Sequence, residues 1–183
     1  MLRMNAIRLA GLGLLVLVAS GCSTYAVPRY TNSADNVTAL RSLRGQEINV
    51  GTFSATKPGV NQISCRAVGP IKTPDGNSFE DFIRNALVAE LKLAEVYSAN
   101  APVTLTGNVD QIDFSSASGN WDIRLTVTSS NGRSISVAEA YRFTSSFYGE
   151  TACNQTAQAM MPAVQNVISK LVSHPEFGAL VGL

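Results

Sequence analysis

Residues 121–143 read WDIRLTVTSSNGRSISVAEAYRF, and the alternation within this stretch decides the fold class. Apolar side chains alternate with polar ones on both sides of Asn131-Gly132, a dipeptide that strongly favours a two-residue hairpin turn. The stretch therefore predicts two antiparallel strands, each with one buried face. Glu139 falls on the apolar side of the return strand, so either this strand lies at a sheet edge or a bulge shifts its register.

Other strands are predicted before this hairpin. Alternation over Val103–Phe114 predicts one strand, and the small residues of 115–120 allow the chain to turn from it into the hairpin. Earlier in the chain, Glu47–Phe53 and Gln62–Val68 each alternate in the manner of a half-buried strand. The three later strands are expected to form an antiparallel meander.

The first predicted helix follows a break in the chain. Pro70, Pro74 and a turn precede Ser78, whose side chain can cap a helix that begins at Phe79. From there apolar residues recur at helical spacing as far as Tyr97. This stripe predicts a helix that packs on the sheet.

A second helical stripe lies near the carboxyl end. We expect this helix to start near Met160 or Met161, because Pro162 suits a first turn, and Cys153 then falls in the preceding loop. His174-Pro175 is expected to end the helix.

The order of these elements predicts an α+β fold. Two strands, a helix, three strands and a helix suit a two-layer sandwich, in which an antiparallel sheet of about five strands carries two helices on one face. The other face of the sheet is expected to stay partly exposed, where a partner could dock.

The amino terminus has the layout of a secretory signal peptide. Basic residues in Met1–Arg8 precede the uninterrupted apolar run Leu9–Ala19. As a helix this run reaches about 16 Å, which is about half of a bilayer's hydrocarbon core and too short for a permanent span.

The apolar run ends in residues 18–22 (VASGC), which resemble the bacterial lipobox. The resemblance implies that the mature chain begins at Cys22 and that the Cys22 thiol carries diacylglycerol. An ordinary signal peptide followed by a chance cysteine is the alternative. Similarity to enterobacterial lipoproteins also implies an address, because Ser23 stands where an Asp would favour the inner membrane. The expected location is the periplasmic face of the outer membrane.

Three segments are predicted along the chain. Residues 1–21 form the signal peptide. Residues 22–45 are mostly polar or small and lack a sustained period, which predicts a lipidated flexible tether, although part of it could lie against the sheet as an extended segment. Residues 46–183 form a single periplasmic domain.

The cysteine count agrees with this interpretation. The chain contains 3 cysteines, and assigning Cys22 to the lipid leaves Cys65 and Cys153 as a pair. An oxidising periplasm would join them as a disulfide, and two buried free thiols are the alternative. Their spacing fits neither a CxxC redox motif nor a zinc site.

Several of these stretches together resemble the YajG-type outer-membrane lipoproteins. They are residues 79–91 (FEDFIRNALVAEL), 103–107 (VTLTG), 119–127 (GNWDIRLTV), the Asn131-Gly132 hairpin and the closing amphipathic helix. More loosely, the layout is similar to the periplasmic α/β modules of LptE, CsgG and the amino-terminal domain of TolB. The resemblance implies the α+β fold and supplies no shared catalytic residues.

The candidates for catalysis are weak. The single histidine, His174, sits at a predicted helix end beside a proline, where a capping or surface role is typical. Ser54-Ala-Thr-Lys57 matches the S-x-x-K of penicillin-binding proteins, yet it lies in a predicted loop and lacks the companion motifs. We therefore predict no catalytic residue, no cofactor and no enzyme activity.

Metal and sugar sites are not favoured either. Asp110 and Asp113 differ by an odd number and should point to opposite strand faces, so together with Asp122 they are expected to be solvated. Trp121 is expected to be a core or sheet-face aromatic rather than a sugar platform.

Charge and composition exclude one class of partner. A formal charge of +1 and singly scattered basic residues give no field with which to attract nucleic acid. The expected function is that of a non-enzymatic, lipid-anchored lipoprotein with an envelope protein partner, acting as an accessory, assembly or interaction subunit. The alternative is a module that binds a small ligand, such as a lipid, a glycan or a peptidoglycan fragment, in a pocket between sheet and helices.

Overall fold

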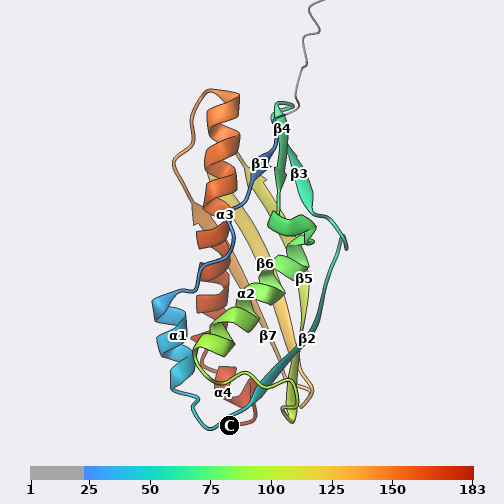
Figure 1. The fold of residues 1–183 in the computed structure, drawn as a ribbon, viewed down its shortest axis with the longest axis vertical. Coiled ribbons are helices and arrows are strands. Elements are labelled where there is room, and N and C mark those ends of the chain that lie inside the picture. The colour runs from blue at the N-terminus through green and yellow to red at the C-terminus, as the bar shows by residue number, and fades with distance from the viewer. Residues whose placement is uncertain (1–22) are drawn as a thin grey trace, which may run out of the picture.

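The computed structural model describes residues 23–183 (Figure 1). The predicted signal peptide and the predicted lipidation site, Cys22, lie outside the described residues. The strands are β1 (Tyr25–Ala26), β2 (Ile48–Ala55), β3 (Gln62–Cys65), β4 (Gly69–Lys72), β5 (Val103–Ser115), β6 (Asn120–Ser129) and β7 (Ser134–Arg142). The helices are α1 (Ala34–Arg41), α2 (Phe79–Leu93), α3 (Gly149–Val172) and α4 (Phe177–Leu180), with a 3₁₀ turn at Pro74–Gly76.

The larger sheet has the strand order β2-β5-β6-β7. Strands β5, β6 and β7 form the predicted antiparallel meander, and the hairpin turns at Gly132, whose φ of +88° suits glycine. Strand β2, however, runs parallel to β5. The prediction of an all-antiparallel sheet is wrong here, because helix α2 lies between the two strands in the sequence and carries the chain back to start β5 in the same direction.

A second, smaller sheet has the order β1-β4-β3 and corrects the prediction of one five-stranded sheet. Strand β3 does not join β2. Instead, the chain turns back at Arg66 and Ala67, which both have positive φ, and β4 pairs antiparallel with β3. Pro70, expected to break the chain, lies within β4 opposite Ser64. Strand β1 pairs with β4 only at Ile71 and Lys72, so it needs no hydrogen bond from the proline.

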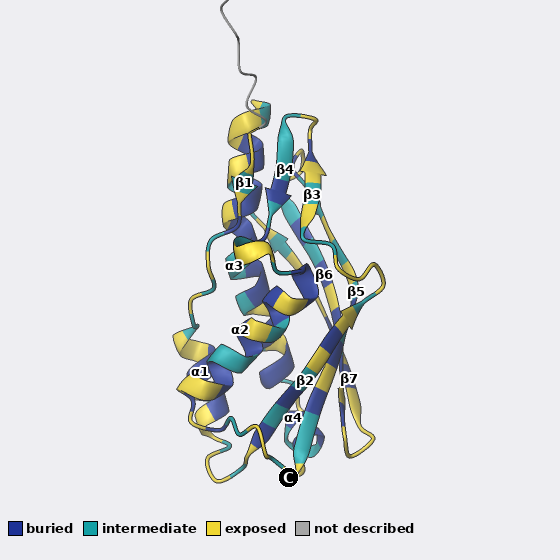
Figure 2. Ribbon diagram, turned by 45° about the vertical axis from the view of Figure 1, so that its right-hand side comes forward, coloured by how far each residue is buried: buried dark blue, intermediate teal, exposed yellow. Residues whose placement is uncertain are grey.

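The helices cover one face of the larger sheet. Helix α2 packs against β2 and β5, and α3 packs against β6 and β7. Figure 2 shows one buried side along each of these helices and alternating burial along the strands. Trp121 is fully buried in this layer, and its Nε1 donates a 2.8 Å hydrogen bond to the carbonyl of Thr156, which confirms its predicted place in the core.

The segment predicted to be a flexible tether contains β1 and α1. Val27, Val37 and Leu40 are buried in the common core, and Ser33 caps α1 by accepting a hydrogen bond from the Asn36 amide. From Tyr25 onward this segment is therefore part of the folded body. Strand β1 matches the alternative of an extended segment that lies against a sheet. Helix α1 was not predicted, because it has only eight residues and a weak apolar stripe.

The predicted start of the first helix is confirmed, but this helix ends at Leu93 and does not run on to Tyr97, and the second helix starts earlier than predicted. Helix α2 begins after Ser78, whose side chain accepts from the Asp81 amide as predicted. Helix α3 begins at Gly149 rather than near Met160, so Cys153 lies in the helix and Pro162 in its interior. The first turns are helical because Ala152, Cys153 and Thr156 are buried on the same side, and this packing outweighs the hydrogen bond that Pro162 cannot donate.

Candidate functional site

A cleft lies between the two sheets, where two strand edges have no neighbouring strand in residues 23–183. Strand β2 pairs with β5 only as far as Ala55, opposite Val109, while β5 continues to Ser115. Strand β3 is one of the two outer strands of the smaller sheet. The cleft between them has a volume of about 470 Å³. Its lining is Ala55, Thr56, Lys57, Val60, Gln62, Ile63, Ser64, Val109, Asp110, Gln111, Ile112 and Asp113.

The lining combines apolar side chains with charges of both signs. Val60, Ile63 and Ile112 supply apolar surface, and Lys57 and Asp110 supply opposite charges. Asp110 is held in place by two hydrogen bonds. Its Oδ1 accepts from the side-chain Nδ2 of Asn108 at 2.6 Å, and its Oδ2 accepts from the Thr126 hydroxyl at 2.7 Å. The cleft therefore presents the fixed carboxylate of Asp110 near the apolar side chains of Val60, Ile63 and Ile112. The backbone edges of β3 and β5 border it.

A β-bulge in β5 shapes this cleft and corrects one prediction. The register between β5 and β6 shifts between Val109 and Gln111, so Asp110 is an extra residue. The bulge reverses the parity of the strand, and Asp113, which stands opposite Asp122, therefore shares the outer face with Asp110. The predicted opposite placement of Asp110 and Asp113 is wrong. Within the described part of the chain, no group of three or more His, Cys, Asp or Glu side chains could hold a metal ion.

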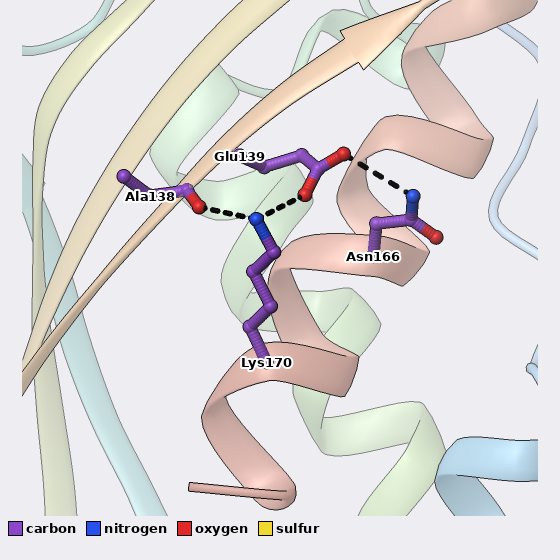
Figure 3. A network of polar contacts seen from close by, with 4 residues as sticks. All are labelled: Ala138, Glu139, Asn166 and Lys170. Carbon is purple, nitrogen blue, oxygen red and sulfur yellow. Dashed lines mark hydrogen bonds and ion pairs between the residues drawn. The ribbon is translucent and has the colours of Figure 1, made fainter.

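The opposite edge of the larger sheet is occupied by side chains of α3 (Figure 3). Lys170 Nζ donates to the carbonyl of Ala138 on β7 at 2.7 Å and pairs with Glu139 Oε2 at 2.7 Å. Asn166 donates to Glu139 Oε1 at 3.2 Å. Of the two predicted explanations for Glu139, the edge strand is confirmed, because β7 is the last strand and its register with β6 is continuous. A lysine at an edge carbonyl discourages pairing with another chain.

The predicted disulfide is confirmed. Cys65 and Cys153 are bonded, with their Cα atoms 5.9 Å apart, and both side chains are buried. The bond joins β3, which lines the cleft, to the first turns of α3. It therefore fixes one wall of the cleft against the helical layer.

The weak candidates for chemistry do not come together. The Ser54 hydroxyl donates to Asn108 at 2.9 Å, and His174 Nδ1 accepts from the Glu176 amide at 3.2 Å, beyond the end of α3. Lys57 is the member of this set that lines the cleft. None of these contacts forms a nucleophile and base pair.

A buried hydrogen-bonded cluster around Glu90 was not predicted from the sequence. Glu90 of α2 is fully buried, and its Oε1 accepts from the Tyr30 hydroxyl at 2.6 Å and from the Ser33 amide at 2.7 Å. Burial, and then the hydrogen bond to Glu90, raise the pKa of the Tyr30 hydroxyl well above its ordinary value. The sequence signal was the position of Glu90 between Leu87 and Leu91 on the apolar stripe of α2. The cluster fastens the amino-terminal segment to α2.

Comparisons with known proteins add no family. Neither protein-family models nor curated proteins match this chain. Among the helices of residues 23–183, none has the length and apolar character needed to cross a bilayer.

Proposed function

We propose that this chain is a non-enzymatic lipoprotein, anchored through lipid on Cys22 at the periplasmic face of the outer membrane. In this proposal it acts as an accessory, assembly or interaction subunit of an envelope protein complex. The signal peptide and the lipobox-like residues 18–22 support the anchor. The cleft between β3 and β5 supports the interaction role, because it places side by side two strand edges that have no neighbouring strand within residues 23–183.

The occupant that suits this cleft is an extended segment of a partner protein. An added strand would supply backbone donors and acceptors to β3 and β5, which is the recognition mode called β-augmentation. Ile63 and Ile112 would contact alternate side chains of that segment, while Lys57 and Asp110 would favour one direction and one pattern of charge. At the β7 edge, by contrast, Lys170 already donates to the carbonyl of Ala138.

Site-specific photo-crosslinking in living cells tests this role. A photoreactive residue replaces Ser64 or Gln111, which line the cleft, and a matched control replaces Ser136, an exposed residue of β7. We expect both cleft positions to capture the same envelope protein through one short segment of it, identified by mass spectrometry of the crosslinked peptide. Capture of the same segment from Ser136, or of nothing from either cleft position, would contradict the proposal.

The anchor has its own test. Mass spectrometry of the mature chain should show an amino-terminal Cys22 that carries diacylglycerol. A Cys22→Ala chain should lose that mass and leave the membrane fraction. An unmodified Cys22 thiol, or a retained leader, would overturn the anchor without affecting the cleft.

A small-ligand module is the second candidate, because the cleft volume falls within the range usual for ligand sites. The predicted place for such a pocket was between sheet and helices, whereas this cleft lies between the two sheets. Native mass spectrometry of the purified protein distinguishes the two candidates. A lipid or glycan that copurifies with the unchanged chain and is lost in Ile63→Lys would favour the ligand module.

A further inference from the structure

Phe147 and Tyr148 are large side chains exposed at one end of the molecule. Phe147 is 92% exposed and Tyr148 75% exposed, and their rings form an edge-to-face pair with centroids 6.1 Å apart. They directly precede helix α3. Nothing in the described chain covers this pair, although aromatic side chains of this size are usually packed against apolar neighbours.

The loop that presents the pair is held by hydrogen bonds. Arg66 donates through Nη1 to the Phe147 carbonyl at 2.9 Å, and the same guanidinium donates to the Ser116 carbonyl. The Ser146 amide donates to Gln155 Oε1 at 2.8 Å, and the Tyr148 amide donates to the Ser146 hydroxyl. The backbone is therefore fixed while both rings face outward, so a surface that received them would order little more than two side chains.

The described chain begins at the same end. The carbonyl oxygen of Ser23 lies so close to Gly69 that a Cβ atom on residue 69 would clash with it. The neighbouring Val68 contacts Gly149, where a Cβ would lie 3.3 Å from Val68 Cγ1. Contacts thus connect Ser23, through the β3-β4 turn, to the start of α3. Figure 1 shows β1, β4 and the start of α3 at the same end of the molecule.

The distance from this end to the proposed lipid is short. Cys22 is bonded directly to Ser23, and consecutive Cα atoms are about 3.8 Å apart. Strand β1 begins at Tyr25, so two residues separate the proposed lipid site from the folded body. The long tether expected from the sequence would have let the domain stand away from the bilayer. Because that segment is instead folded from Tyr25 onward, this end of the domain stays close to the lipid.

We propose that Phe147 and Tyr148 insert into the interfacial layer of the membrane that carries the lipid on Cys22. This inference rests on the proposed anchor. Aromatic rings favour the boundary between headgroups and acyl chains, where the phenyl ring is removed from water and a tyrosine hydroxyl still meets polar groups. With the lipid as a first attachment and the aromatic pair as a second, the domain would rest on the bilayer in one orientation, with the α4 end directed away.

Depth-dependent quenching tests the orientation. The lipidated full chain is reconstituted into phosphatidylethanolamine and phosphatidylglycerol vesicles whose acyl chains carry bromine near the headgroups. Phe147→Trp provides the reporter, and Arg133→Trp, on the exposed β6-β7 hairpin at the α4 end, provides the matched control. The unchanged chain supplies the background from the buried Trp121.

We expect bromine to quench the added fluorescence strongly in Phe147→Trp and almost not at all in Arg133→Trp, because aromatic rings settle at the membrane–water interface. Quenching of neither reporter in vesicles that still float with the protein would overturn the inference and leave the anchor intact. Equal quenching of both would also overturn it, because the domain would then have no fixed orientation. Protein that fails to float with the vesicles would overturn the anchor, and with it this inference.

Discussion

The hydroxyl of Tyr30 donates a 2.6 Å hydrogen bond to Oε1 of the fully buried Glu90, and this contact ties the amino-terminal segment to helix α2. We expect Tyr30→Phe to lower the free energy of unfolding by about 1–3 kcal/mol, because a buried carboxylate oxygen loses a donor. Chemical denaturation monitored by circular dichroism measures this change.

Tyr25 supplies the matched control for that experiment. Its hydroxyl is buried without a hydrogen-bond partner in the described residues. Tyr25→Phe should therefore leave the free energy of unfolding unchanged or raise it. Equal losses in the two variants would show that the Tyr30 hydrogen bond has no special role.

The raised pKa of Tyr30 leads us to expect a loss of stability in alkaline solution. The folded-state pKa of Tyr30 is raised, so its contribution is fully present below the ordinary tyrosine pKa of about 10 and is lost as the pH rises above that value. The free energy of unfolding should therefore fall above this pH. Tyr30→Phe should reduce the fall in the free energy of unfolding between pH 10 and pH 11. The same fall in both proteins would contradict the role of Tyr30.

Reduction of the disulfide should weaken the whole domain. Cys65 and Cys153 are 88 residues apart, and closing a loop of that length stabilises a fold by about 4–5 kcal/mol in the chain-entropy model. We expect a paired Cys65→Ala and Cys153→Ala variant to lose most of this amount in urea denaturation. A reductant should destabilise the unchanged chain and leave the paired variant unaffected.

Lys170 and Glu139 should behave as a coupled pair. Glu139 is nine-tenths buried, so Lys170→Met leaves its carboxylate without a cation and should cost about 1–3 kcal/mol. Adding Glu139→Gln to that variant should recover most of the loss, because a neutral amide needs no counter-charge. Additive losses in the double-mutant cycle would show that the two side chains act independently.

Local signals in the sequence predicted the parts of the fold that depend on neighbours in the chain. Asn131-Gly132 sets its hairpin through backbone preference, and Ser78 caps its helix through its own side chain. The Cys65–Cys153 bond was predictable from counting, because only two cysteines remained to pair.

The missed parts depend on residues far away in the sequence. Helix α1 has only eight residues and is held by long-range contacts. The Asn36 side chain donates hydrogen bonds to Glu90 and to the Gln165 carbonyl, both more than 50 positions away. The place of β3 in a second sheet could not be predicted, since the alternation of apolar and polar residues is the same in either sheet. The cleft likewise depends on tertiary structure, because its shape is set by where β2 stops pairing with β5 and by the bulge at Asp110.

The parallel pairing of β1 with β4 determines how the domain meets mechanical load. A pull on Ser23 along the strand axis strains the Tyr25 and Ala26 pairs with β4 in shear, at the same time rather than one after the other. Behind them, the force reaches Tyr30 and its bond to α2 before it reaches the larger sheet. A pull applied at Ser23 would therefore load the smaller sheet and helix α2 early, before the larger sheet bears the force.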